Sequence, residues 1–371
     1  MPVVVKTQSP VDLLALVPAL VGFTPQQSVV LLPFRGKRTC GAIRFDLPSA
    51  GPPAVNKRFA TFVVGTLCKL RGVDSVILVV VTNEAFGCSS APPSGELAQT
   101  MLARLRQSGL RVQDALCQAS DGWGSYLDAE LPAGGRSLSE IADSDAPESV
   151  PPEVRRALAA PPPPSRVPDA VASEKRRVKT EFARYQRLVK QAEDTVDLPP
   201  ELEPLEDLPE LMERALEWDE SEISKKCALL LFAWQGPPIR DMTMLQWATE
   251  IWVADLILDE AEAAGCKVPS AHPGADKLLG DLMIGVGPRP DLDRIDRGIK
   301  LLRAVVARAD AAERVAPLCM LTWLSWAIGH GTEAGRYLDE AGSIRPDYGM
   351  VEVLNAMLSN GMMPEWAFAE S

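Results

Sequence analysis

Eight prolines fall between Pro147 and Pro168, four of them consecutive from Pro161 to Pro164, and they limit what this 371-residue chain can fold into. Proline lacks a backbone N–H and has a fixed φ, so neither a helix nor a central strand continues through such a stretch. We predict an extended polyproline II connector over residues 143–172. The chain is therefore expected to form one domain over 1–142 and another over 173–371.

The charge balance differs between these two parts. Residues 1–142 hold 13 bases and 10 acids, whereas residues 195–371 hold 15 bases and 31 acids. Within the second part, the segment 193–222 carries 13 acids and one base, Arg214. One base against 13 acids gives −12, which equals the net charge of the whole chain, so the acidity is concentrated in this acidic segment.

Residues 1–142 have patterns typical of alternating helices and strands. A continuous β-branched run predicts a strand covered on both faces at 75–81. The run 41–47 alternates instead, with Ile43 and Phe45 on one face and Arg44 and Asp46 on the other. We also predict strands at 29–32 and 111–117, and helices at 10–21 (capped by Ser9), 54–71 and 94–108. The expected fold is a small α/β domain with a mixed sheet, containing a right-handed βαβ unit.

The second part has helical periodicity throughout. Helices are expected at 173–194, 239–264 and 291–309, and the apolar residues of the middle one should be core: Trp247, Ile251, Trp252, Leu256 and Ile257. A helical hairpin follows from Ala316. Its second helix has Ala334, Leu338, Ala341 and Pro346 at the offsets of a tetratricopeptide repeat. We therefore expect an all-α domain that ends in a tetratricopeptide-like hairpin.

Several stretches resemble a known family. SPVDLLALVPALVGFTPQQSVVLL at 9–32 and IRFDLP at 43–48 are similar to the start of actinobacterial proteins grouped as domain of unknown function 4192. Weaker similarity continues in DGWGSYL at 121–127 and GTEAGRYLDEAGSIRPDY at 331–348. The resemblance implies a fold and no activity. Many members carry a Cys-Pro element where this chain has DAELPAGG at 128–135, so no metal or redox role is implied there.

The residue types disfavour catalysis and metal binding. Two histidines, His272 and His330, leave few candidates for a general base or a metal ligand. Seven cysteines include no Cys-x-x-Cys pair, and we expect most of them to be buried, reduced thiols. We therefore predict no catalytic residue, no metal site and no cofactor.

One polar set is the candidate binding site: Asp12, Ser28, Arg44 and Asp46, with Trp123 as a stacking surface. Arg44 and Asp46 share a strand face, so they stand side by side. The other interpretation is structural, with an ion pair at the sheet and caps on the first helix. Both interpretations are left open by the sequence.

These observations favour a non-enzymatic interaction or regulatory protein, with a protein partner at the acidic segment 193–222 or the helical domain. No apolar run is long enough for a membrane span and the start lacks signal-peptide features, which predicts a cytoplasmic protein without a membrane partner. The basic run at 175–190 is expected to be a solvated helix face, and nucleic-acid binding is disfavoured by the acidic flanks. The alternative is a small-molecule or nucleotide-binding enzyme whose polar set meets the 82–95 loop in a pocket.

Overall fold

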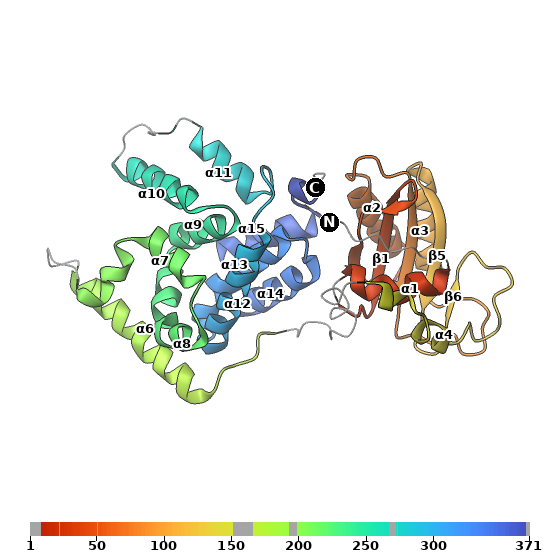
Figure 1. Cartoon of the computed structure of the whole chain (residues 1–371), viewed down its shortest axis with the longest axis horizontal. Coiled ribbons are helices and arrows are strands. Elements are labelled where there is room, and N and C mark those ends of the chain that lie inside the picture. Colours follow the sequence, from red (N-terminus) through yellow and green to blue (C-terminus); the bar gives the residue numbers. More distant parts are fainter. Residues whose placement is uncertain are drawn as a thin grey trace. The chain divides into compact units, whose positions relative to one another are not determined.

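The computed structural model describes residues 9–21, 23–49, 51–150, 166–192, 199–266, 272 and 274–368. The chain divides into two compact units, Met1–Pro163 and Pro164–Ser371 (Figure 1). Most of the predicted proline connector lies outside the described residues, including Pro161 to Pro164. In the described part of the chain, no helix combines the length and apolar character needed to cross a membrane.

The first unit is built on a mixed sheet of six strands. At its centre, β4 (Ser75–Val81) pairs with β1 (Ser28–Arg35) antiparallel and with β5 (Arg111–Gln118) parallel. The strand β6 (Trp123–Ser125) extends the sheet beyond β5. On the other side, β2 (Arg38–Thr39) and β3 (Ile43–Asp46) both pair with β1. The helix α3 (Gly95–Gln107) connects the parallel pair β4 and β5, which no tight turn can join.

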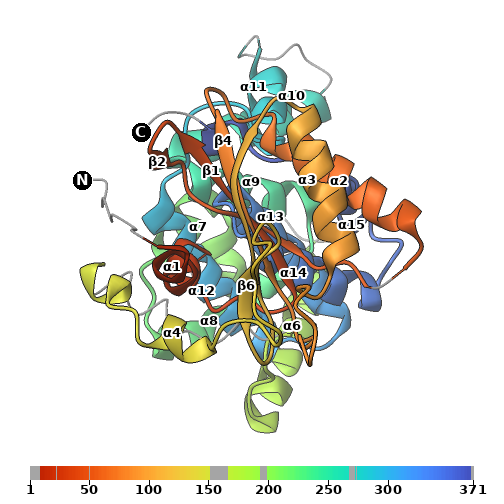
Figure 2. The same ribbon diagram turned by 90° about the vertical axis from the view of Figure 1, so that its right-hand side faces the viewer.

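Helices cover both faces of this sheet (Figure 2). On one face, α2 (Pro53–Leu67) and α3 pack against alternate strand residues such as Leu31 and Leu78. On the other face, α1 (Pro10–Val21) and α4 (Leu138–Ala142) pack against Val30 and Val79. Because both faces are covered, β4 is buried along six of its seven residues, which explains its continuous apolar sequence. The predicted α/β fold with a mixed sheet is confirmed.

The first unit continues beyond the boundary expected at residue 142. A short 3-10 helix, η1 (Ala146–Ser149), packs against α1, and Ser144 Oγ donates to Asp12 Oδ1 at 2.9 Å. Pro147 lies in the first turn of η1, where a missing N–H breaks no helical hydrogen bond. The first eight residues of the predicted connector, 143–150, therefore belong to the folded unit.

The second unit is all-α, as predicted, and its helices share one hydrophobic core. Two antiparallel helices near the end form the predicted hairpin, in which Ala334 and Ala341 are fully buried and let the helices approach closely. Its kinship with a tetratricopeptide repeat stays a prediction. The elements are α6 (Ala172–Ala192), η2 (Pro200–Leu205), α7 (Leu208–Ala215), α8 (Glu220–Ala233), α9 (Pro237–Ala248), α10 (Ile251–Cys266), α11 (Ala275–Met283), α12 (Leu292–Arg308), η3 (Ala312–Arg314), α13 (Val315–Ala327), α14 (Gly331–Ile344), α15 (Gly349–Ser359) and η4 (Glu365–Phe368).

A buried ion cluster ties the start of the second unit to its helices. The side chain of Arg314 is only 1% exposed; it pairs with Asp169, lies 3.3 Å from Glu340 Oε1 and donates to the Ala309 carbonyl at 3.1 Å. Glu340 also accepts from the backbone N–H of Val167 at 3.3 Å. The extended residues before α6 are thereby held on the α13–α14 hairpin.

Candidate functional site

Three members of the predicted polar set lie together at the edge of the first unit's sheet. Arg44 Nε donates to Ser28 Oγ at 2.9 Å, and Arg44 Nη2 lies 2.6 Å from Asp46 Oδ1. Ser28 Oγ in turn donates to the Gln26 carbonyl at 2.6 Å. The Arg44 side chain is 7% exposed, with its guanidinium 6.0 Å from the centre of the Phe23 ring. These groups bond to one another and leave the arginine little access to a ligand.

The other two members, Asp12 and Trp123, have different partners. Asp12 accepts from Ser144, and its backbone N–H donates to Ser9 Oγ at 3.1 Å, which makes Ser9 the predicted cap of α1. Trp123 is 5% exposed in the core beneath α1, and the Arg136 guanidinium lies 5.6 Å from its ring. The indole is therefore not open for stacking on a ligand.

The loop after β4 is organised by acids that act as structural caps. Asp121 accepts from the backbone N–H groups of Phe86 at 2.8 Å and Gly87 at 3.0 Å, and these two bonds lower the pKa of its carboxyl. Ser94 Oγ donates to Glu84 Oε2 at 3.4 Å. The polar groups at this edge thus hold the loop in place.

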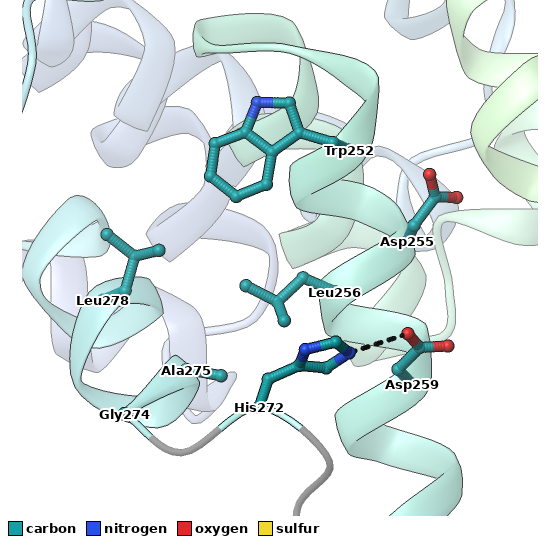
Figure 3. Close-up of a pocket in the computed structure, with 8 residues that line it drawn as sticks. All are labelled: Trp252, Asp255, Leu256, Asp259, His272, Gly274, Ala275 and Leu278. Carbon is teal, nitrogen blue, oxygen red and sulfur yellow. Dashed lines mark hydrogen bonds and ion pairs between the residues drawn. The ribbon is translucent and has the colours of Figure 1, made fainter.

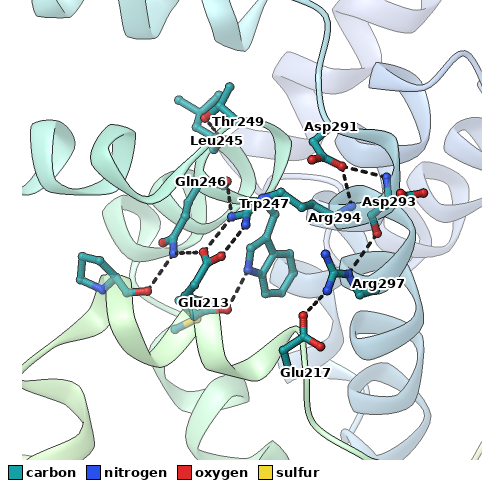
Figure 4. Close-up of polar contacts among 12 residues, drawn as sticks. Glu213, Glu217, Leu245, Gln246, Trp247, Thr249, Asp291, Asp293, Arg294 and Arg297 are labelled. Atoms are coloured by element: carbon teal, nitrogen blue, oxygen red, sulfur yellow. Dashed lines mark hydrogen bonds and ion pairs between the residues drawn. The ribbon is translucent and has the colours of Figure 1, made fainter.

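The acidic segment folds onto the helical unit instead of forming a separate surface. Glu213, on α7, accepts two hydrogen bonds from the Arg294 guanidinium, with the Nη2–Oε2 pair at 2.7 Å (Figure 4). Gln246 Nε2 donates to the same carboxylate at 3.0 Å. The Arg294 contact is the main cause that lowers the pKa of Glu213. Beside it, Glu217 pairs with Arg297.

Most acids of this segment that the structure describes have comparable roles. Glu201 pairs with Arg184 and Glu220 with Arg308, while Asp207 caps the start of α7. Leu202, Met212 and Ala215 are buried between them. Residues 193–198 lie outside the described residues. From 199 onward, four acids pair with arginines of the same unit and two cap helices, which leaves fewer charges available to a partner.

Three of the seven lysines and arginines in the basic run on α6 pair with acids of the same unit, and a fourth donates to a serine. Lys175 pairs with Asp169, Lys179 with Asp310 and Arg184 with Glu201, and Arg177 donates to Ser224. Such pairing removes cationic charge that a phosphate backbone would need.

The structure offers little chemistry for a metal or a reactive thiol. Among the described residues, no group of three or more His, Cys, Asp or Glu is arranged to hold a metal ion. Burial raises the pKa of Cys117 and Cys319 to about 12 and that of Cys227 to about 11, so these thiols stay protonated. The expected burial is wrong for three other cysteines, which are exposed: Cys40, Cys68 and Cys88.

A cleft of about 580 Å³ lies between α10 and α11 (Figure 3), within the roughly 300–1,000 Å³ typical of ligand sites. Four of its lining residues belong to α10 and are spaced three and four residues apart, which places their side chains on one face of the helix: Trp252, Asp255, Leu256 and Asp259. We call it the α10–α11 cleft and define it by its lining residues: Trp252, Asp255, Leu256, Asp259, His272, Gly274, Ala275 and Leu278.

The lining combines apolar surface with negative charge. Figure 3 shows Trp252, Leu256 and Leu278 around the opening, with the carboxylates of Asp255 and Asp259 along the α10 side. His272 Nε2 lies 3.2 Å from Asp259 Oδ2. Apolar side chains and carboxylates in one cleft can contact both the apolar and the cationic parts of a ligand.

The cleft exists because the helix predicted over 239–264 is in fact two helices. Arg294 Nη2 donates to the Gln246 carbonyl at 3.1 Å, and the backbone N–H of Asp291 donates to the Ala248 carbonyl at 3.0 Å. These bonds satisfy carbonyls at the end of α9 that a continuing helix would have used. Thr249 then leaves the helical region with φ −126° and ψ −106°, and α10 starts in a new direction.

This break changes the environment of two residues that periodicity assigned to the core. Trp247 is fully buried, as predicted, but Ile251 is 36% and Trp252 50% exposed, so the prediction is wrong for both. One signal in the sequence pointed to this. Asp255 and Asp259 lie three and seven residues after Trp252, on the same helix face, and a wholly buried face would not carry two acids.

Exposed apolar residues gather around this part of the chain. Nine large apolar side chains are exposed in the described residues, and four of them lie between 251 and 292: Ile251, Trp252, Ile284 and Leu292. The helix α10 carries four acids and no lysine or arginine. Exposed apolar surface with charge of one sign at its rim is typical of an interaction site.

Comparisons with known proteins identify a family and nothing closer. The sequence model of the family described as "Domain of unknown function (DUF4192)" matches residues 10–365. No curated protein and no solved structure matches the chain. Any function must therefore be argued from the residues themselves.

Proposed function

This chain belongs to the DUF4192 family, and from that premise, which carries no activity, we propose that it is a non-enzymatic protein-interaction module. The observation that carries the proposal is the α10–α11 cleft, which a half-exposed tryptophan, Trp252, lines together with two carboxylates. Tryptophan is enriched among the residues that dominate binding energy at protein interfaces. We place the protein in the cytoplasm, as the sequence suggested, and the contact region in the helical unit.

Within the helical unit, we propose the α10–α11 cleft as the contact region in place of the acidic segment. The acidic segment was the first candidate, but from residue 199 onward most of its acids pair with arginines or cap helices of the same unit. The cleft, in contrast, has apolar walls exposed to solvent. It is therefore the better candidate for a partner.

The alternative was an enzyme that binds a small molecule or nucleotide at the first unit's sheet. Ser28, Arg44 and Asp46 bond to one another, while Asp12 and Trp123 contact other residues. The acids near the 82–95 loop serve the loop backbone. Because these groups do not converge on a common ligand position, we retain the interaction function.

Site-specific photocrosslinking tests the proposal. We would replace Ile251 with benzoylphenylalanine in the full chain, irradiate cells of the source organism and separate the adducts by size. The matched control carries the same crosslinker at Val353, an apolar residue of α15 that is 51% exposed against 36% for Ile251. We expect a discrete protein adduct at 251 that is absent at 353 and lost with Trp252→Ala. The same adducts at both positions, or none at 251, would refute the proposal.

A further inference from the structure

The chemistry of the α10–α11 cleft identifies the class of its partner. We propose, building on the interaction function above, that the cleft binds a basic protein segment in which an arginine or lysine stands next to an apolar residue. The cation would lie on the Trp252 ring, where the negative charge of Asp255 and Asp259 on the same helix attracts it. The apolar neighbour would contact Leu256 and Leu278.

Charge complementarity is the first argument. Asp255 is exposed and has no ion-pair or hydrogen-bond partner in the part of the chain that the structure describes. Asp259 Oδ2 lies 3.2 Å from His272 Nε2, and no lysine or arginine pairs with it in the described residues. With four acids and no base, α10 attracts a cation and repels an acidic segment.

The second argument is the indole of Trp252. Tryptophan provides the most favourable ring for a cation, and arginine adds planar stacking. This chain already uses the same contact elsewhere: Lys226 Nζ lies 4.7 Å from the ring centre of Trp218, and the Arg136 guanidinium lies 5.6 Å from that of Trp123. Among the described residues no cation covers Trp252, although it is half exposed beside two carboxylates.

The third argument separates a protein segment from a small cation. A metal ion would use the carboxylates alone, and in the described residues no set of acids and histidines is arranged for a metal. A free polyamine carries ammonium groups but no apolar side chain that could fill the space between the helices. The apolar walls at Leu256, Ala275 and Leu278 match a side chain that carries no charge. Ile251, the first residue of α10, and Ile284, directly after α11, are further exposed apolar residues of this helix pair and its ends. A peptide with both kinds of side chain uses all of these features.

Fluorescence anisotropy with defined peptides tests this inference. The probe is a labelled peptide whose centre reads Arg-Leu-Arg between Gly-Ser flanks, titrated with the full chain. Its counterparts carry citrulline or glutamate in place of arginine, and spermine serves as an unlabelled competitor. We expect the arginine peptide to bind at least tenfold more tightly than the citrulline peptide. High salt should weaken its binding, because exposed charge pairs are screened.

Variants locate the contact. Trp252→Leu and the double variant Asp255→Asn/Asp259→Asn should each weaken binding at least tenfold, whereas Trp252→Phe should retain most of it because the ring remains. The matched controls are Val353→Ala, and Asp339→Asn/Glu352→Gln, which removes two exposed charges from α14 and α15. Neither control should change the affinity by more than about twofold. Thermal melts establish that every variant is folded.

Three results would overturn the inference. Equal binding of the citrulline peptide would show that the cation is not recognised, and equal losses in the controls would show that only net charge matters. If spermine displaced the labelled probe at the same concentration as the unlabelled arginine peptide, or at a lower one, the cleft would be a site for small cations. The two experiments can fail separately. If the peptides do not bind but the crosslink at 251 forms, the cleft binds a partner of another class. If the crosslink at 251 does not form, the interaction function itself is refuted.

Discussion

Removal of the buried Arg314 side chain should destabilise the helical unit strongly. Arg314→Met keeps most of the side-chain volume and removes the charge. In the folded protein, Glu340, which is 6% exposed, then loses the buried one of its two guanidinium partners. Truncation of one member of a buried ion pair typically costs about 3–5 kcal/mol, because the remaining charge stays buried.

The structure places the expected loss near the lower end of that range. Glu340 retains the backbone N–H of Val167 at 3.3 Å and the largely exposed Arg166, whose Nε lies 3.2 Å away. Asp169 is half exposed, so water can replace its lost partner. We therefore expect a loss of about 3 kcal/mol. For a unit of this size this corresponds to a decrease in Tm of roughly 6–12 °C.

Thermal and denaturant unfolding of the full chain, followed by tryptophan fluorescence, measures this effect. Seven of the eight tryptophans lie after residue 164, so the signal reports mainly on the helical unit. Arg289→Met, at an exposed arginine, is the matched control and should change stability by less than about 0.5 kcal/mol. The double variant Arg314→Met/Glu340→Gln should regain part of the loss. If Arg314→Met were as stable as the control, the assignment of a buried ion cluster would be wrong.

Three further predictions concern packing, pH and thiols. Gly298→Ala should lower the free energy of unfolding by about 1–3 kcal/mol, because the new Cβ would lie 2.6 Å from Trp247 Cε3. Gly335→Ala should raise it by about 0.5–1 kcal/mol, because no atom lies within 4 Å of the new Cβ and alanine favours the helix. Denaturant unfolding measures both. The pKa of Glu213 is lowered from its ordinary 4.5, so the stability that this carboxylate contributes is present above that pH and is lost as the pH falls through the folded-state pKa. In Glu213→Gln, the free energy of unfolding should therefore depend less on pH on the acid side. An unchanged pH dependence would contradict the ion pair with Arg294. In native protein, maleimide should label the exposed thiols at Cys40, Cys68 and Cys88 and spare those at Cys117, Cys227 and Cys319 until denaturant is added, as read by peptide mass spectrometry.

Elements with local causes could be predicted from the sequence. The strand at 75–81 is predicted to the residue because its β-branched run is continuous. The start of α1 follows from Ser9 and Pro10 at the cap and first position. The alternation at 41–47 predicts that Phe45 lies on the apolar face of its strand, and in the structure this face packs on α2, where Phe45 contacts the rings of Phe59 and Phe62. In each case neighbours in the chain supply the determining interaction.

The candidate site could not be predicted in the same way. Trp252 looks like a core residue on periodicity, and its exposure depends on contacts that Asp291 and Arg294 make with the end of α9. The polar set in the first unit had the opposite outcome: Arg44 and Asp46 were correctly placed side by side, yet Ser28 satisfies the arginine from the adjacent strand.

The acidic segment marks the division between what sequence and tertiary structure decide. Composition alone establishes that 193–222 holds a charge of −12, because charge is a sum over residues. Which charges remain available depends on distance in space, since ion pairing falls off over a few ångströms. Arg184, Arg294, Arg297 and Arg308 come from α6 and α12 and pair with four acids of this segment only in the folded unit. On α10, in contrast, Asp255 and Asp259 line a cleft together with the exposed Trp252, and no arginine of the unit pairs with them in the described residues.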